Sequence, residues 1–236
     1  MTTGSPSFLP WLAVFETLRV VRGRALFIEE HWASLNRSAQ ALGLTVSADL
    51  RLRAQSFALP PEEGRWRWIV SAEETRDLFI PEKVSTDKAY ALGISAQRVG
   101  SKNWDARHKT VSHLTHWQAR QAAQALGLDE GVLLNEHSEL ASGAMSNLFW
   151  IKDGKVRTPA TEVGCRAGVV RQWVLDQMKV ETGSYPLPAL DLADEVFVTN
   201  SMIGIMPVNR FGDRRYPIGP VTEELLRKYR AVVAAA

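Results

Sequence analysis

The sequence predicts an α/β protein of the α+β type that is divided into two lobes. Its 236 residues, 45% of them hydrophobic and 23% charged, are enough to bury one large core or two smaller ones. Short runs of β-branched and aromatic residues alternate with segments in which apolar residues recur every three or four positions, which are the patterns of strands and amphipathic helices. A polar stretch interrupts these patterns near the middle of the chain. We therefore expect an N-terminal α+β lobe over residues 1–100, a linker over 101–108 and a C-terminal lobe over 109–236.

The N-terminal lobe is expected to combine a hairpin, an amphipathic helix and further strands. In the helix, Trp32, Leu35 and Ala39 recur at helical spacing, and Gly43 follows at a position typical of a helix C-cap. The predicted elements are hairpin strands at residues 12–21 and 25–28, the helix at 29–42, and strands at 66–71 and 89–99, the last two separated by a loop at Pro81.

The C-terminal lobe is expected to open with a long helix that ends at Gly127. Asp153-Gly154 is a strong hairpin signal between two strands, and Gly168 lies in a turn that leads into a helix near Val169. The predicted elements are helices at residues 110–127, 169–178 and 222–232 and strands at 131–135, 147–152, 155–158 and 195–199, the last followed by a loop at 200–204.

Composition excludes several classes of function. The formal net charge of +2 is the remainder of 28 basic and 26 acidic side chains, so we expect no nucleic-acid partner and no acidic membrane surface as a partner. Cys165 is the single cysteine, which excludes an internal disulfide and suits a reducing cytosol. Residues 1–12 show neither a signal-peptide pattern nor a membrane span, so a cytoplasmic location is predicted.

A series of short motifs resembles the class-IV aminotransferase family, the fold-type IV pyridoxal phosphate enzymes, in both order and spacing. They are Phe15-Glu16-Thr17-Leu18-Arg19-Val20, His31-Trp32-Ala33-Ser34-Leu35, Lys109, Gly127-Leu128-Asp129-Glu130, Ser146-Asn147-Leu148-Phe149, Thr158-Pro159, Gly168-Val169-Val170-Arg171 and Thr199-Asn200-Ser201. The family includes branched-chain and D-amino acid aminotransferases and 4-amino-4-deoxychorismate lyase. The resemblance implies a fold like that of D-amino acid aminotransferase, with a larger C-terminal lobe built on a barrel-like sheet. It also implies pyridoxal 5'-phosphate as cofactor, a small amine or amino acid as substrate, and a homodimer.

Lys109 is the predicted catalytic residue, because it stands where the family keeps the lysine that binds the cofactor aldehyde. A lysine must be neutral to attack an aldehyde, so its pKa has to be lowered by burial or by nearby positive charge. Arg107 and His108 are its neighbours in sequence. The resemblance also places Thr17 near the substrate.

The cofactor phosphate is expected to bind backbone N–H groups of Gly168, Val169 and Val170, because the start of a helix favours anions. The resemblance implies a second phosphate turn, and further cofactor contacts follow from the motif register. The residues concerned are Asn200, Ser201 and Met202 in that turn, and Asn147.

Two positions depart from the family pattern. Ser34 stands where the family has a phosphate-binding arginine, and Arg37, one turn further along the helix, is the predicted substitute, with Arg171 and Arg19 as weaker ones. Ser142 stands where the family has a glutamate that pairs with the pyridine nitrogen, and a serine can hydrogen-bond that nitrogen but brings no negative charge. Glu139 lies nearby in sequence, but would need a changed turn to take that role.

These departures favour a lyase that forms 4-aminobenzoate and pyruvate, because that cleavage depends less on the cofactor as an electron sink than transamination does. Residues 199–208 also resemble the lyases more than the branched-chain enzymes. Two alternatives remain, namely a D- or branched-chain amino acid aminotransferase, and a family member with lost or altered cofactor use that binds a small molecule. His113 and His116 are spaced as a possible metal pair on a helix, but no third ligand stands out, so no metal site is predicted.

Overall fold

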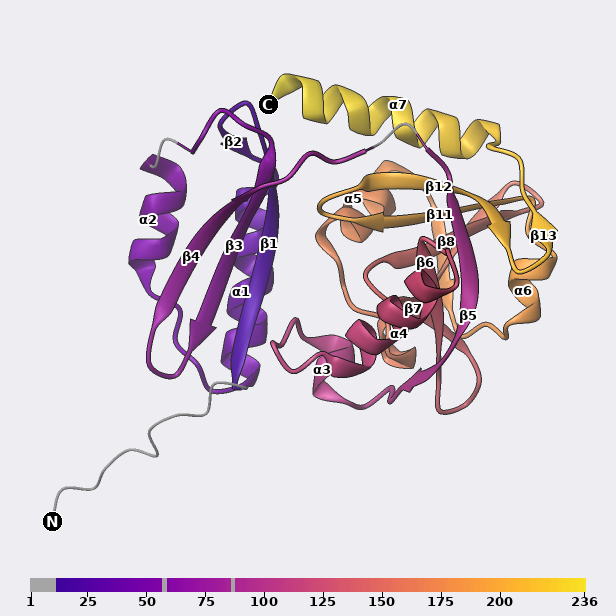
Figure 1. The fold of residues 1–236 in the computed structure, drawn as a ribbon, viewed down its shortest axis with the longest axis horizontal. Helices are drawn as coiled ribbons and strands as arrows, with labels where there is room; N and C mark the ends of the chain where they lie inside the picture. The colour runs from indigo at the N-terminus through magenta and orange to yellow at the C-terminus, as the bar shows by residue number, and fades with distance from the viewer. Residues whose placement is uncertain (1–11, 57–58, 86–87) are drawn as a thin grey trace, which may run out of the picture. The chain divides into compact units, whose positions relative to one another are not determined.

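The computed structural model describes residues 12–56, 59–85 and 88–236, and their contacts divide the chain into two compact units (Figure 1). The first unit runs up to Glu82 and includes His108–His113; the second comprises Lys83–Arg107 and Leu114–Ala236. The expectation that the N-terminus holds neither a signal peptide nor a membrane span concerns residues 1–12, nearly all of which lie outside the described residues.

The first unit is a four-stranded antiparallel sheet in the order β2-β1-β3-β4, packed against two helices. Its core consists of strand residues such as Leu18, Trp66 and Trp68 and helix residues such as Leu35 and Leu50. The elements are β1 (Ala13–Val21), β2 (Arg24–Ala25), α1 (Ile28–Ala41), α2 (Ala48–Ser56), β3 (Gly64–Ser71) and β4 (Thr75–Pro81).

Helix α1 ends as the sequence predicts. Gly43 has a φ of 69°, the left-handed conformation that glycine adopts without strain, and its N–H donates to the Gln40 carbonyl. The Leu44 N–H donates to the Ala39 carbonyl, which completes a Schellman motif. The last turn of the helix is thereby closed by backbone hydrogen bonds.

Two elements of this unit differ from the sequence prediction. The second hairpin strand covers only Arg24–Ala25 instead of residues 25–28, because Phe27 takes a left-handed φ of 56° and α1 begins directly after it. Strand β4 was not predicted, since its charged residues and terminal Pro81 conceal the period of a strand. The charged residues and Pro81 are tolerated in β4 because it is an edge strand that pairs only with β3.

The second unit is built on a mixed nine-stranded sheet in the order β10-β9-β8-β11-β12-β5-β6-β7, with β13 paired to β12. The two ends of this order meet, because the Leu140 N–H at the start of β7 donates to the Tyr185 carbonyl just after β10, at 2.8 Å. The sheet is therefore curled into a half-barrel. Its strands are β5 (Tyr90–Val99), β6 (Glu130–Asn135), β7 (Leu140–Gly143), β8 (Asn147–Lys152), β9 (Lys155–Pro159), β10 (Val180–Gly183), β11 (Glu195–Asn200), β12 (Gly204–Phe211) and β13 (Arg214–Arg215).

Helices cover the outside of this sheet, and α7 runs along β12 and β11 (Figure 1). The interior is filled by buried apolar side chains such as Leu92, Leu148, Trp150 and Val198. The helices are α3 (Trp104–Arg107), α4 (Leu114–Ala125), α5 (Val169–Gln177), α6 (Pro188–Asp191) and α7 (Pro220–Ala235), with a short 3-10 helix at Thr161–Val163. No helix among the described residues combines the length and apolar character needed to cross a lipid bilayer.

The compact units differ from the lobes expected from sequence at two points. Strand β5 belongs to the second unit although it precedes residue 100, because it pairs in parallel with β12 and β6. The segment around Lys109 belongs to the first unit, because Thr110 forms an antiparallel bridge with Val14 of β1. Since this segment is extended, the helix expected over residues 110–127 begins only at Leu114.

Candidate active site

Lys109 is held by backbone hydrogen bonds to β1. The Phe15 N–H donates to the Lys109 carbonyl at 2.8 Å, and the Val111 N–H donates to the Ala13 carbonyl at 2.9 Å. The half-buried Lys109 side chain places its Nζ 4.9 Å from the centroid of the Phe15 ring. The backbone on both sides of the amine is thus fixed to a strand, which limits where the amine can reach.

A buried acid lies close to Lys109. The Glu16 carboxylate is 4% exposed and accepts a 2.8 Å hydrogen bond from Nδ1 of His31, which is 1% exposed. Burial alone would raise the pKa of Glu16, but the hydrogen bond from His31, the positive charges of His31 and Lys109 and a hydrogen bond from Ser34 together lower it to about 2. Glu16 is therefore an anion at neutral pH and supplies negative potential near Lys109.

The N-terminal candidate site residues have the following surroundings within the first unit. The Ser34 hydroxyl hydrogen-bonds Glu16, and Arg37 is exposed on α1. The Arg19 guanidinium pairs with Glu63, with its Nε at 2.9 Å and its Nη2 at 2.6 Å from one carboxylate oxygen. Thr17 is buried on β1, opposite Arg67 of β3. Ser34 and Arg19 are thus engaged with carboxylates of their own unit.

The start of α5 is an uncapped helix N-terminus. Its N-cap residue is Gly168, and no side chain among the described residues caps the first turn, which contains Val169 and Val170. A Cβ on residue 168 would lie 2.2 Å from the Asn147 side-chain oxygen, so any larger residue here would have to displace the Asn147 side chain. The Asn147 Nδ2 donates to the Arg166 carbonyl at 2.8 Å and thereby fixes the loop in front of the helix. The Gly168 N–H already donates to the Arg166 carbonyl at 2.9 Å, so the N–H groups of Val169 and Val170, together with the helix dipole, leave this turn suited to an anion.

Arg171 brings positive charge to the same turn. It is 5% exposed, and its Nη2 donates to the Pro159 carbonyl at 3.0 Å. Its Nε is buried and has no hydrogen-bond partner among the described residues. A buried guanidinium without a carboxylate is unfavourable unless an anion approaches it.

The second predicted phosphate turn, at Asn200–Met202, is closed by its own side chain. The Asn200 Oδ1 accepts hydrogen bonds from the backbone N–H groups of Met202 and Ile203, both at 2.9 Å. The Asn200 Nδ2 donates to the Met145 carbonyl at 3.1 Å. The Met202 N–H is therefore used inside the turn, while Ser201, which is half-buried, makes no hydrogen bond through its hydroxyl within the described chain.

Ser142 is buried in β7 opposite Leu133 of β6. Two glutamates, Glu130 at the start of β6 and Glu139 just before β7, differ in their charge state. Glu139 accepts hydrogen bonds from Ser184 and, at 2.7 Å, from the Asn135 amide, and these bonds lower its pKa. It is therefore held away from the role of a replacement for the family glutamate. Glu130 is different, since burial raises its pKa to about 7 despite a 3.1 Å hydrogen bond from the Met145 N–H and the opposing effect of the nearby Ser146 hydroxyl. Near neutral pH this carboxyl is often uncharged.

His113 and His116, whose spacing suggested one helix, do not lie on the same helix. His113 precedes α4, and its ring lies 3.1 Å from the Thr110 carbonyl and 5.3 Å from the Phe15 ring centroid. His116 is on the helix and is buried. Within residues 12–56, 59–85 and 88–236 no three potential ligands from histidine, cysteine, aspartate or glutamate are grouped to hold a metal.

Residues 13–211 match the model of the amino-transferase class IV family. The chain belongs to this family. It is 27% identical to an aminodeoxychorismate lyase of Bacillus subtilis, over 89% of this chain and 80% of that protein. A branched-chain aminotransferase of Thermoproteus uzoniensis solved with norvaline has the same fold, with a TM-score of 0.85 at 23% identity over 98% of this chain and 88% of that one. An aminotransferase of Brucella abortus bound to PLP matches with a TM-score of 0.79 at 22% identity, over 95% and 90% of the two chains.

These comparisons confirm the two-part fold with a barrel-like sheet, and they make this class-IV aminotransferase a pyridoxal phosphate enzyme, a lyase or an aminotransferase. The residues present fit such a group. Within the second unit, the start of α5 and Arg171 offer the N–H donors and positive charge that its phosphate needs. Within the first unit, Lys109 offers the amine that its aldehyde needs.

The sequence analysis did not single out Glu16, Arg67 or Glu130 of this class-IV aminotransferase, although the first two had a sequence signal. Glu16 stands among Val14, Leu18 and Val20, the core-facing positions of β1, so a charge there indicates a buried pair. Arg67 alternates with Trp66 and Trp68 and must lie on the face opposite to them. The raised pKa of Glu130 had no sequence signal, because it depends on tertiary burial.

Proposed function

We propose that the protein is a 4-amino-4-deoxychorismate lyase, which forms 4-aminobenzoate and pyruvate. The observation that carries this proposal is the set of groups around Ser142. A buried hydroxyl stands at the position of the family glutamate, Glu139 is bonded elsewhere, and Glu130 has its pKa raised to about 7. An enzyme without a fixed anion there has a weak electron sink, and a reaction whose product becomes aromatic needs that sink least.

In the proposed reaction Lys109 is the base and the acid. Bound pyridoxal phosphate supplies an aldehyde that holds an amine and a ring that withdraws electrons from it. The Lys109 amine, freed when the substrate amine takes its place, accepts the proton from the ring carbon of the substrate. The C–O bond to enolpyruvate breaks as the ring becomes aromatic, and Lys109 returns its proton to the departing enolpyruvate, which becomes pyruvate. Glu16 supports the protonated form of Lys109 between the two transfers.

We further propose that the phosphate binds at the first turn of α5, through the N–H groups of Val169 and Val170 and the hydroxyl of Ser201; the Gly168 N–H is already bonded to the Arg166 carbonyl. The family has a phosphate-binding arginine at the position of Ser34. Here Arg171 provides that positive charge, and its buried Nε has no hydrogen-bond partner in the described chain. Arg171 supports this role better than Arg37, which is exposed.

A homodimer is the proposed assembly. Besides the family resemblance, it is supported by large apolar side chains that stay exposed in the second unit, namely Trp104 at 52%, Leu114 at 64% and Trp117 at 51%. The lone Cys165, which is buried, supports the expected cytoplasmic setting.

Pyruvate release tests the proposed function. The purified protein is loaded with pyridoxal phosphate and given 4-amino-4-deoxychorismate, and pyruvate and 4-aminobenzoate are measured separately. We expect both products in equal amounts from the wild type and none above background from Lys109→Ala. Amino transfer from an amino acid to a 2-oxo acid, without pyruvate from this substrate, would instead establish an aminotransferase. If Lys109→Ala kept wild-type turnover, the assigned role of Lys109 would be refuted.

A further inference from the structure

Glu130 is a buried acid of the second unit that takes no part in the proposed reaction. It lies at the start of β6 and is 3% exposed. Its Oε1 accepts a 3.1 Å hydrogen bond from the N–H of Met145, in the short turn at residues 144–146 between β7 and β8. Burial of a carboxyl is costly, and this hydrogen bond is what a carboxyl gains here over an apolar side chain.

The β7–β8 turn, residues 144–146, is held tightly against the start of β6. The Ala144 N–H donates to the Gly131 carbonyl at 2.8 Å, and the Gly143 N–H donates to the Ser146 carbonyl at 2.9 Å, which closes the turn. A Cβ on residue 143 would lie 3.0 Å from Cγ of Glu130, so the Glu130 side chain packs directly on the backbone that leads into the turn. The position of Met145 therefore depends on Glu130.

Met145 connects the β7–β8 turn to the turn at Asn200–Met202. The Met145 carbonyl accepts a 3.1 Å hydrogen bond from Nδ2 of Asn200. Oδ1 of the same amide accepts the N–H groups of Met202 and Ile203, both at 2.9 Å. An amide that donates on one side and accepts on the other is fixed in its plane, because a flip would break all of these bonds.

A continuous chain of hydrogen bonds thus leads from the Glu130 carboxyl through the Met145 backbone and the Asn200 amide to the Asn200–Met202 turn. Strand pairing supports this chain, because Asn147, the first residue of β8, is opposite Thr199, which directly precedes Asn200 in β11. All of these residues belong to the second unit. A change at residue 130 is therefore expected to reach the Asn200–Met202 turn.

We propose that Glu130 is a positioning residue for the cofactor phosphate, which holds the Asn200–Met202 turn, through Met145, in the place where Ser201 meets that phosphate. The inference deepens the proposed function and rests on it, because it takes this turn as part of the phosphate site. The chain needs an oxygen at residue 130 that accepts a hydrogen bond, and a carboxyl provides one whether or not it is ionised. Phosphate affinity should therefore depend on that oxygen rather than on the charge.

Pyridoxal, which lacks the phosphate, is the matched probe for pyridoxal 5'-phosphate. Equilibrium dialysis gives the dissociation constant of each, and the constant for pyridoxal divided by that for pyridoxal phosphate is the phosphate ratio. A general loss of structure weakens both ligands and leaves this ratio unchanged, whereas a misplaced phosphate turn lowers it. At about pH 6, below the pKa of about 7 that burial gives Glu130, the wild-type side chain is mainly uncharged, like its replacements.

Three variants at residue 130 separate the oxygen from the charge. Glu130→Met has a side chain of similar length without an acceptor, and it should lower the phosphate ratio by about tenfold, because the buried Met145 N–H loses its partner. Glu130→Leu is measured beside it, so that either apolar variant with the wild-type circular dichroism spectrum decides. Glu130→Gln keeps an acceptor oxygen and should keep the wild-type ratio.

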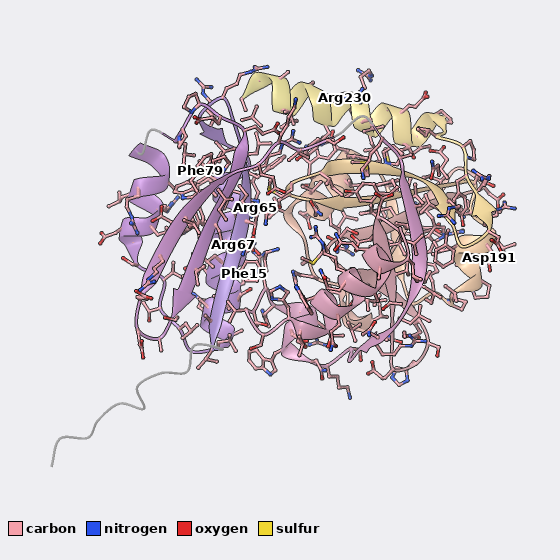
Figure 2. All side chains as sticks on the ribbon, viewed as in Figure 1. Phe15, Arg65, Arg67, Phe79, Asp191 and Arg230 are labelled. Atoms are coloured by element: carbon pink, nitrogen blue, oxygen red, sulfur yellow. The ribbon has the colours of Figure 1, made fainter. Side chains whose placement is uncertain are left out.

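Glu195 offers a matched control. It is 5% exposed and accepts backbone N–H groups at the start of α7, that of Thr222 at 2.8 Å and that of Val221 at 3.3 Å. It lies at the other end of β11 from Asn200, and α7 lies outside the sheet, where Figure 2 shows its exposed Arg230. Glu195→Met should lower the melting temperature and leave the phosphate ratio unchanged.

A double-mutant cycle tests the route through Asn200. Asn200→Ala removes the link between Met145 and the turn and should itself lower the phosphate ratio. If Glu130 acts through this link, Glu130→Met in the Asn200→Ala background should change the ratio by less than about twofold. Effects of the two substitutions that simply multiply would overturn the route.

The results separate the inference from the proposed function. A wild-type ratio in the apolar variants of Glu130, or an equal loss in Glu130→Gln, overturns the positioning role. Equal affinity of the wild type for pyridoxal and pyridoxal phosphate overturns the phosphate site, and the inference with it. If the ratio depends on residue 130 as expected but no pyruvate forms from 4-amino-4-deoxychorismate, the lyase assignment fails and the positioning role stands.

Discussion

Two buried glutamates, Glu16 and Glu130, have pKa values shifted in opposite directions. Glu16 and Glu130 are both almost fully buried, and burial raises the pKa of each. Glu16 has cationic partners in His31 and Lys109 and ends with a pKa of about 2. Glu130 has the charge of Arg120 only as a smaller effect, and its pKa stays at about 7 because burial outweighs it. The difference therefore lies in whether a cationic partner is bonded directly to the carboxylate, as His31 is to Glu16.

Glu16→Gln should destabilise the protein by about 3 kcal/mol at pH 7, because it leaves the buried His31 without its carboxylate. The folded pKa of Glu16 lies below its ordinary 4.5, so its contribution is complete above pH 4.5 and is lost as the pH falls towards 2. Urea unfolding at pH 7 and at pH 3 should show the variant approaching the wild type in acid. Glu29→Gln is the control, since its pair with Arg51 is exposed and should contribute less than about 1 kcal/mol. A difference between wild type and Glu16→Gln that stays constant with pH would contradict the assigned ion pair.

Glu130→Gln should show the reverse pH dependence. The folded pKa of Glu130 lies above its ordinary 4.5, so its contribution is complete below pH 4.5 and is lost as the pH rises through about 7. Glutamine does not ionise, and its oxygen can still accept the hydrogen bond from the Met145 N–H. The quantity to compare is the free energy of unfolding of the variant minus that of the wild type. Between pH 4.5 and pH 8.5 this difference should rise in favour of the variant by up to about 3 kcal/mol. Parallel stability curves over this range would show that Glu130 titrates normally.

At the scale of the element, the start of α5 depends on one close contact. The Asn147 side-chain oxygen occupies the place that a Cβ on residue 168 would take, and Asn147 in turn fixes the loop through the Arg166 carbonyl. The helix begins without a side-chain cap, so its first N–H groups are available to a ligand. A change at Gly168 should therefore affect cofactor binding more than folding.

Gly168→Ala should weaken the affinity for pyridoxal phosphate by about tenfold or more, because the new methyl group displaces Asn147 and the helix start with it. Equilibrium dialysis gives the affinity, and far-UV circular dichroism checks the fold. Gly154→Ala serves as control, since its site is open and lies in the β8–β9 turn; it should cost some stability, because Gly154 has a φ of 71°, and leave cofactor affinity unchanged. Equal affinities in wild type and Gly168→Ala would remove the start of α5 from the cofactor site.

Elements with a clear period were predictable from sequence, and those fixed by long-range pairing were not. The periodic helix α1 and its end at Gly43 were predicted closely, as were the buried strands β6, β8 and β11. Strand β4 escaped because an edge strand carries mixed polar residues, and β7 because only four residues pair. The extended segment around Thr110 was predicted as helix, because its pairing with Val14 of β1 is a long-range contact that the local sequence does not show.

At the scale of the whole molecule, contacts assign the predicted catalytic lysine to the N-terminal unit, although it follows the first strand of the second one in sequence. The sequence motifs were sufficient to predict the family and its cofactor, because they occur in the family's order along the chain. The family model matches the same part of the chain, residues 13–211. They could not show that Arg19 and Ser34 have carboxylate partners or that Arg67 lacks one, because these facts depend on which side chains meet in space.

The attachment site of the cofactor tests the central claim most directly. The protein loaded with pyridoxal phosphate is reduced with borohydride, digested and mapped by mass spectrometry. We expect one pyridoxyl adduct, on Lys109, and no adduct in Lys109→Ala. An adduct on another lysine, or none on the wild type, would contradict the account of this site.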